Sequence, residues 1–312
     1  MWRQAVIIHP GVMTWDRGQG NDMKEVLTMW RDARMVALTA VVAAVYMTAL
    51  IPFKGLVIVP GFTEVRPANV LPVALGLLFG PATAWGAAIG NLLSDAFGGT
   101  LSAGSAFGFA GNFFSGFAAY KLWGCLGPLS SDEKPTMRSL PQLLEFVVIS
   151  VVSAAGTAAI IAWGLDLLGL FPFSVFALII TVNNFLAAVV IGPPLLYLLY
   201  PRIEDAGLLY TELMDERHLP QPSAQHRQVA AVGLAGVSVA WLVVGIALGT
   251  LVQGIPFGVP AGGLDPGTGG STLQAAVGAV AFVLLLGFSV VSAGMVPREL
   301  GPNDPKRAGR SD

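Results

Sequence analysis

Long apolar segments limit what this chain can fold into. Of its 312 residues, 54% are hydrophobic and only 12% are charged, whereas soluble domains are usually about 25% charged. Several of the apolar segments approach the roughly 20 residues that a helix needs to cross a bilayer. Helices of this kind, separated by Gly and Pro, are typical of membrane proteins. The sequence therefore predicts an all-α integral membrane protein.

Glycine, proline and polar residues divide the apolar sequence into eight predicted helices. Proline favours the first position of a helix and disfavours helix at the residue before it. The first six helices are predicted to form one bundle, and the last two a C-terminal hairpin. The second and third are short, so one of them could be tilted, broken or only partly inserted. The predicted helices cover residues 34–53, 67–79, 82–97, 103–123, 141–168, 174–200, 228–252 and 273–296.

Positive charge predicts the orientation of these helices in the membrane. If they alternate, 15 of the 17 Lys and Arg residues fall on one side, which is then the cytoplasmic side and holds both termini. The exceptions, Lys54 and Arg66, flank the first outer loop. They either attract an anionic solute or extend to the outer headgroups, and the second alternative is favoured for Lys54.

The same pattern divides the chain into five predicted parts. A cytoplasmic N-terminal segment precedes a six-helix substrate-binding core, and a cytoplasmic linker connects that core to two further transmembrane helices and a cytoplasmic tail. No cleavable signal peptide is evident in the N-terminal segment. The parts are residues 1–33, 34–200, 201–227, 228–297 and 298–312.

Several functions find no support in the sequence. The single cysteine, Cys125, cannot form an intramolecular disulfide or a cysteine metal cluster. There is no phosphate-binding G-x-x-x-x-G-K-[ST] loop, no G-x-S-x-G and no H-E-x-x-H. The net charge of −2 gives no reason to expect nucleic acid binding. We therefore expect neither an enzyme nor a bound cofactor or metal.

Polar side chains inside the apolar segments are the candidates for a solute site. An Asp or Arg near the bilayer centre costs about 2.5–3.5 kcal/mol, so each needs a reason to be there. The sequence Gly-Asn-x-x-Ser occurs twice, at Gly90 and at Gly111, and its Asn and Ser share one helix face. These groups either bind a solute or join neighbouring helices, and Asp95 could instead pair with Arg66. The candidate substrate-binding residues are Glu64, Arg66, Asn69, Asn91, Asp95, Asn112, Trp163, Asn183 and Asn184.

Small residues form a stripe on the first predicted helix and the residue at its entry. Ala33, Ala37, Ala40 and Ala44 are spaced by four, three and four residues, which keeps them on one side. Small residues at such spacing let another helix approach closely. The stripe is therefore either a docking face for a partner subunit or a packing face inside this bundle.

Residues 34–201 resemble the substrate-binding S components of energy-coupling-factor (ECF) transporters, which are prokaryotic importers of vitamins and related micronutrients. The resemblance rests on six helices of suitable length, on the alanine stripe, and on the run RPANVLPVALGLLFGPATAWGAAIGNLLSD. This run has an apolar stretch, an F-G-P turn and a Gly-rich helix that ends in an acid. The two C-terminal helices depart from the six-helix pattern of the family.

The resemblance implies a multi-pass protein of the cytoplasmic membrane that captures a micronutrient from outside. The first outer loop, residues 54–65, would cap the site, and Asn112, Trp163, Asn183 and Asn184 would help to line it. The alanine stripe would dock on a transmembrane coupling subunit driven by two cytosolic ATPases. A queuosine precursor, riboflavin or a folate-like compound would suit the polar residues. A self-sufficient secondary transporter or channel, or a membrane scaffold without a solute, are the alternatives.

Overall fold

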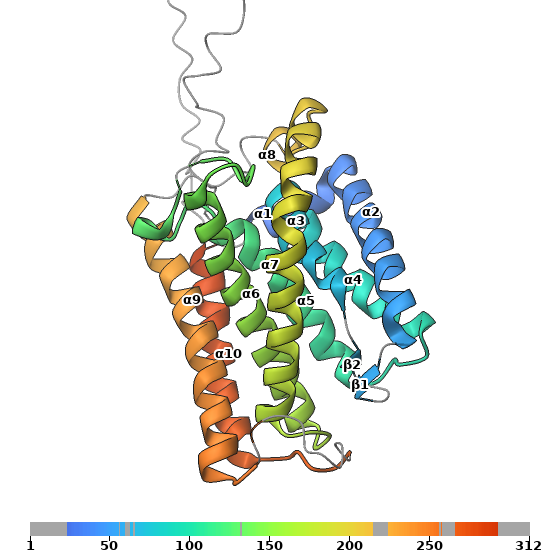
Figure 1. Ribbon diagram of the computed structural model, residues 1–312, viewed down its shortest axis with the longest axis vertical. Helices are drawn as coiled ribbons and strands as arrows, with labels where there is room; N and C mark the ends of the chain where they lie inside the picture. Colours follow the sequence, from blue (N-terminus) through green and yellow to red (C-terminus); the bar gives the residue numbers. More distant parts are fainter. Residues whose placement is uncertain are drawn as a thin grey trace, which may run out of the picture.

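Long helices that run roughly along one axis make up most of the protein (Figure 1). This computed structural model describes residues 24–55, 57–59, 63–64, 66–131, 133–214, 224–255, 257 and 266–292. The predicted helices correspond to α2–α7, α9 and α10, so the predicted all-helical class is confirmed. The α-helices are α1 (Lys24–Thr28), α2 (Ala33–Leu50), α3 (Val70–Phe79), α4 (Pro81–Phe97), α5 (Gly104–Leu122), α6 (Leu140–Leu167), α7 (Phe173–Asp205), α8 (Tyr210–Leu213), α9 (Ala224–Ala247) and α10 (Thr272–Ser292).

Short elements complete the described chain. Two short antiparallel strands, β1 (Val57–Val59) and β2 (Thr63–Glu64), form a hairpin between α2 and α3. A π-helical turn (Leu248–Val252) extends α9. The 3₁₀ turns are Met29–Arg31, Ile51–Gly55, Pro67–Asn69 and Gly127–Leu129.

Five helices of the described chain are long and apolar enough to cross a membrane. The protein is therefore a multi-pass membrane protein. The 10 residues of α3 are too few to span a bilayer by themselves. The five candidate spans are Ala33–Phe53, Leu140–Leu167, Phe173–Leu213, Gln228–Val252 and Thr272–Ser292.

A tight turn at Gly80 reverses the chain between α3 and α4. Gly80 has a φ of +52°, a conformation that glycine adopts without a steric penalty. A Cβ atom at this position would lie 2.7 Å from the ring of Tyr210. The turn therefore depends on glycine for two reasons, its backbone conformation and the aromatic ring of α8 packed against it.

Glycines on α4 allow α2 to pack closely against it. A Cβ atom on Gly86 would lie 2.7 Å from the Val42 side chain, and one on Gly90 would lie 2.7 Å from the carbonyl oxygen of Ala43. The helices α4, α5, α6 and α7 then follow one another, each packed on the one before it. The buried residues of α2 are Met35, Thr39, Val42, Ala43, Tyr46 and Leu50.

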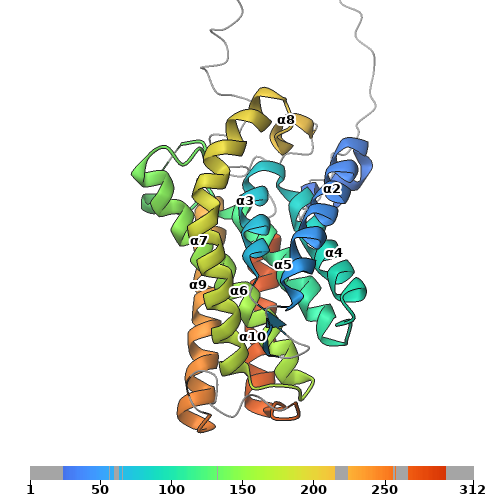
Figure 2. The ribbon, with the colours of Figure 1, turned by 45° about the vertical axis from the view of Figure 1, so that its right-hand side comes forward.

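The C-terminal hairpin α9–α10 packs on α6 and α7, on the side of the bundle away from α2 (Figures 1 and 2). The buried Asp166 carboxylate at the end of α6 joins this helix to the start of α7 and to the segment just before α10. It accepts hydrogen bonds from the backbone N–H of Phe173 at 2.8 Å and of Ser271 at 2.9 Å. Gln274 on α10 donates to the carbonyl oxygen of Gly245 on α9 at 2.7 Å. The hairpin is thus fixed to the core by buried polar contacts as well as by apolar packing.

A buried ion pair holds α1 against the bundle. Lys121 lies in the last turn of α5, and its side chain is fully buried. Its ammonium group pairs with the carboxylate of Glu25, which is also buried. Trp85 on α4 donates to the backbone carbonyl of Val26 at 2.9 Å. The start of the described chain is therefore part of the packed interior.

Candidate solute-binding site

A polar cavity lies at the end of the bundle that carries the β hairpin and the α4–α5 and α6–α7 turns. Its volume is about 70 Å³, and a single water needs about 10–15 Å³ by the same measure. The cavity thus has room for several waters or for the ring of a small polar solute. It is lined by Arg66, Asn69, Asn91, Asp95, Thr100, Ser102, Gly104, Ser105, Gly108, Asn112, Thr157, Ile161, Leu165, Phe176, Ile180, Asn183 and Asn184.

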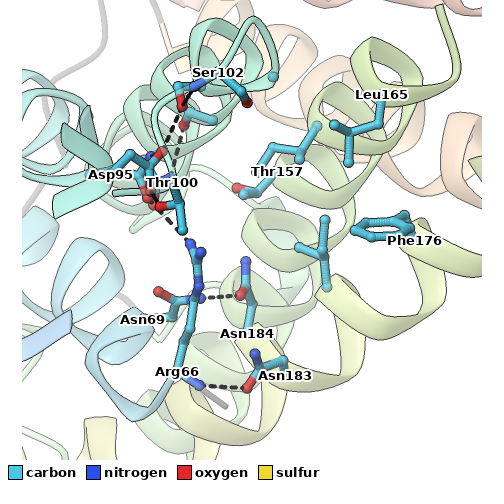
Figure 3. Close-up of a pocket in the computed structure, with 17 residues that line it drawn as sticks. Arg66, Asn69, Asp95, Thr100, Ser102, Thr157, Leu165, Phe176, Asn183 and Asn184 are labelled. Carbon is cyan, nitrogen blue, oxygen red and sulfur yellow. Dashed lines mark hydrogen bonds between the residues drawn. The ribbon is translucent and has the colours of Figure 1, made fainter. Parts of the chain in front are cut away.

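Charged and amide groups meet on one side of this cavity (Figure 3). The Asp95 carboxylate accepts from Ser105 Oγ at 2.9 Å, from Thr100 Oγ1 at 3.3 Å and from Asn91 Nδ2 at 3.4 Å. Arg66 Nη1 donates to Asn91 Oδ1 at 3.3 Å. Asn91 therefore connects the guanidinium and the carboxylate, and it holds both groups at the cavity wall.

A second cluster of polar side chains consists of asparagines from the 3₁₀ turn before α3, from α5 and from α7. The hydroxyl of Tyr46 on α2 lies 2.7 Å from Asn69 Oδ1 and 2.7 Å from Asn112 Oδ1. Asn69 also hydrogen-bonds Asn184 on α7. Asn183, the neighbour of Asn184, accepts from the backbone N–H of Arg66 at 3.1 Å. The amides on the 3₁₀ turn before α3, on α5 and on α7 are thereby linked across the site.

The opposite wall is mostly apolar. Figure 3 shows Thr157, Leu165 and Phe176 facing the charged groups from the other side. Ile161 on α6 and Ile180 on α7 also line this wall. The hydroxyl of Thr157 donates to the carbonyl oxygen of Gly111 at 3.1 Å. A polar wall facing an apolar one suits a flat solute with polar edges, since few polar groups then fix its orientation.

The region that builds this cavity also matches a known protein family. Residues 36–201 match the model of the QueT transporter family. The chain belongs to the QueT transporter family. It is accordingly a membrane transporter and not an enzyme. The comparisons found no matching curated protein and no matching solved structure.

The family match divides the fold of this QueT member into two parts. It covers most of α2, all of α3–α6 and most of α7, and it includes every residue that lines the cavity. It ends before α8 and before the α9–α10 hairpin. The cavity therefore belongs to the part that this chain shares with its family.

Seven of the nine candidate residues from the sequence line the cavity: Arg66, Asn69, Asn91, Asp95, Asn112, Asn183 and Asn184. Their contact with a solute stays a prediction. The side chains of the predicted cap, residues 54–65, lie outside the described part of the structure, and those of Lys54 and Glu64 are among them. The two serines of the Gly-Asn-x-x-Ser repeat do not line the cavity, and Ser115 instead bonds Ser153 on α6 at 2.9 Å.

Trp163 lies away from the cavity. Its indole N–H donates to the carbonyl oxygen of Ala275 on α10 at 3.3 Å. Its ring packs near Trp241 and Phe282 of the hairpin, with centroid distances of 5.8 and 5.5 Å. We therefore remove Trp163 from the proposed solute contacts, because its side chain joins α6 to the hairpin.

Residues that the sequence analysis missed complete the polar wall. Thr100, Ser102 and Ser105 follow or begin helices around the α4–α5 turn. Such short polar residues near glycines are ordinary turn residues, so their sequence gave no separate signal. Tyr46 was missed because an aromatic residue in an apolar helix usually packs in the core.

The four alanines of the small-residue stripe are all exposed on α2. The buried face of the helix, which includes Tyr46, points to α4 and the cavity instead. Ala33, Ala37, Ala40 and Ala44 therefore do not pack inside this bundle. The stripe remains available to lipid or to another protein.

Proposed function

We propose that this QueT family member is the solute-binding S component of an ECF-type importer and that its solute is a queuosine precursor. The observation that carries the proposal is the polar cavity within the family-matched residues. Arg66 and Asp95 bring opposite charges to a region of apolar helices, where ionisable groups are costly and usually serve a solute or an ion. Their convergence on one cavity favours a binding role over simple helix contacts.

The chemistry of the cavity fits the ring that queuosine carries. A 7-deazaguanine ring is flat, and one edge presents N–H donors beside a carbonyl acceptor. The Asp95 carboxylate suits the donors, and the Arg66 guanidinium and the amide N–H groups suit the carbonyl. Phe176 and the aliphatic residues of the other wall suit the face of the ring. The QueT family match also favours this solute over riboflavin and folate-like compounds.

The exposed alanine stripe supports the proposed docking on a coupling subunit. Ala33, Ala37, Ala40 and Ala44 leave a shallow surface on α2 against which another helix can pack closely. The α9–α10 hairpin packs on the other side of the bundle and leaves this surface open (Figure 1). In this proposal cytosolic ATPases drive transport through that subunit, and residues 34–200 form the solute-binding core.

The proposed orientation places the cavity toward the outside of the cell. Among the described cations, Arg34, Lys134, Arg138 and Arg202 belong to segments at the other end of the bundle. Positively charged connections favour the cytoplasmic side. The N- and C-termini are then cytoplasmic, and the solute enters from outside through the end that carries the β hairpin.

The alternative function is a secondary transporter that uses the hairpin as part of a solute path. The contacts of Trp163 with Trp241 and Phe282 argue against it, because they fill the region between α6 and the hairpin with aromatic side chains. The hairpin is better explained as a support for α6.

A titration and a reconstitution test the proposal. We expect queuine, the free base of queuosine, to bind the purified protein in a calorimetric titration, and guanine to bind more weakly. Arg66→Ala should weaken queuine binding at least tenfold, as expected for loss of a hydrogen bond to a charged group, worth about 1.5–3 kcal/mol. Arg202→Ala is the matched control, since Arg202 is exposed at the other end of α7.

A transport assay distinguishes an S component from a self-sufficient secondary transporter. In liposomes, uptake of queuine should require ATP, the coupling subunit and its ATPases. Absence of queuine binding by the wild-type protein would remove the proposed solute. Uptake by this chain alone, without ATP, would overturn the S-component assignment and support the secondary transporter.

A further inference from the structure

The hydroxyl of Tyr46 occupies a central position among the amides of the cavity wall. Tyr46 is fully buried on α2, and its hydroxyl lies 2.7 Å from the side-chain oxygens of both Asn69 and Asn112. Both asparagines line the cavity, whereas Tyr46 itself lies behind them. One group on α2 thus contacts two cavity residues that come from different parts of the chain.

A hydroxyl carries a single proton, so it cannot donate to both amide oxygens at once. Asn112 has a fixed orientation, because its Nδ2 donates to the carbonyl oxygen of Gly108 at 2.8 Å. Asn69 is held on its other side by a second amide, because its Nδ2 donates to Asn184 Oδ1. The Tyr46 proton therefore goes to Asn69 Oδ1 or to Asn112 Oδ1, and both amide oxygens lie within reach of the same hydroxyl.

The resulting chain of hydrogen bonds has one direction. It runs outward from the Tyr46 hydroxyl, which donates to Asn69 Oδ1 or to Asn112 Oδ1. Asn69 Nδ2 donates in turn to Asn184 Oδ1, and Asn112 Nδ2 donates to the Gly108 carbonyl. This order determines which atoms of Asn69 and Asn184 remain to face a solute, since an amide presents either an oxygen or N–H groups at each end. Without the hydroxyl, the Asn69–Asn184 pair could take either orientation.

We propose that Tyr46 is a positioning residue for solute recognition, whose hydroxyl orients the amides of Asn69 and Asn112 at the cavity wall. Tyr46 acts through these asparagines and need not touch the solute. The inference rests on the proposed function, because it requires a solute in this cavity. It adds a role for a residue on α2, the helix whose other face carries the exposed alanines.

Calorimetric titration with queuine tests this role in the full-length protein. We expect Tyr46→Phe to weaken binding about tenfold, an effect within the range for a lost buried hydrogen bond. Tyr200→Phe is the matched control, because Tyr200 is equally buried but lies near the other end of α7. It should change queuine affinity less than about twofold, within the usual error of independent sites. Thermal midpoints of both variants show whether a loss of affinity merely follows a loss of stability.

A double-mutant cycle distinguishes positioning from simple support of the fold. If Tyr46 acts through Asn112, Tyr46→Phe should weaken binding less than about threefold in an Asn112→Ala background, because coupled residues have non-additive effects. If the two residues contributed independently, the fold losses of affinity in the two single variants would multiply in the double variant. If Tyr46→Phe does not yield folded protein, the cycle between Asn69→Ala and Asn112→Ala measures the same link and should also be non-additive.

The possible results separate this inference from the proposed function. No binding of queuine by the wild-type protein removes the proposed solute and the positioning role with it. Wild-type binding that Tyr46→Phe leaves unchanged, or effects that multiply in the cycle, overturn the positioning role alone. Wild-type binding with a weakened Tyr46→Phe and a non-additive cycle supports both.

Discussion

Asp95 lies where hydrogen-bond donors from α4, the α4–α5 turn and α5 converge, which makes its charge the clearest residue-level test of the cavity. Asp95→Asn retains the shape of the side chain but removes the charge. We expect queuine affinity to fall at least tenfold, because a hydrogen bond to a charged group contributes about 1.5–3 kcal/mol. Glu133→Gln is the control, since Glu133 lies in the α5–α6 connection. An unchanged affinity in Asp95→Asn, measured by calorimetric titration, would exclude Asp95 from the site.

The Glu25–Lys121 pair allows a second test at the residue scale. Both side chains are buried, so Glu25→Gln leaves the Lys121 ammonium without its counter-charge. Breaking a buried ion pair in this way typically costs about 3–5 kcal/mol, whereas replacing both charges by apolar groups is often neutral. We expect a marked fall in the thermal midpoint for Glu25→Gln and recovery in the Glu25→Leu/Lys121→Met double variant.

The exposed pair Lys134–Glu204 provides the comparison for that test. Its side chains are 42% and 29% exposed, and surface pairs of this kind contribute about 0–1 kcal/mol. Glu204→Gln should therefore change the thermal midpoint little. If Glu25→Gln is equally mild, then the buried pair does not hold α1 in place.

The sequence indicated the charged cavity residues, whose burial costs free energy, but not the aromatic residue, whose burial is expected in any apolar helix. Arg66 and Asp95 attract attention in any apolar segment, because each charge there requires compensation. Tyr46 does not, since an aromatic residue in an apolar helix is expected whether or not its hydroxyl has a role. The direction of the Trp163 side chain could not be predicted from local sequence, because it depends on a contact with α10, more than a hundred residues later in the chain.

At the scale of helices, the contact between α2 and α4 depends on glycine. A Cβ atom at Gly90 would lie 2.7 Å from the Ala43 carbonyl oxygen, whereas nothing lies within 4 Å of one at Gly236 on α9. We expect Gly90→Ala to lower stability by about 1–3 kcal/mol, the usual effect of overpacking. Gly236→Ala should be neutral or stabilise by up to about 1 kcal/mol, because alanine favours helix. Equal thermal midpoints for the two variants would contradict this account of the packing.

The sequence predicts where the helices begin and end better than it predicts which helices contact one another. Apolar length, Pro81 at the start of α4 and the capping residues before α6 mark helix ends locally, and the predicted bounds follow them closely. The placement of α8 against Gly80 arises from a distant contact with Tyr210, which no local pattern indicates. The side on which the hairpin packs likewise depends on tertiary contacts of Asp166 and Trp163.

For the whole molecule, the arrangement of the hairpin and α2 has a functional consequence. The bundle has one side covered by α9 and α10 and another where α2 lies exposed (Figure 2). The cavity lies between them, and Tyr46 reaches it from the buried face of α2. If α2 docks on a coupling subunit, solute capture and docking use opposite faces of the same helix, and they can be separated by mutation.

Bulky substitutions on the exposed face of α2 test that separation. Ala37→Trp and Ala40→Trp should prevent close approach of a partner helix, because small residues are what permit it. We expect each variant to bind queuine as the wild-type protein does, yet to lose co-purification with the coupling subunit and ATP-dependent uptake. Val283→Trp on the exposed face of α10 is the control for added bulk at the lipid-facing surface, and it should retain both. Retained assembly in both alanine variants would show that docking uses another surface, while a parallel loss in Val283→Trp would indicate that the hairpin also contacts the partner.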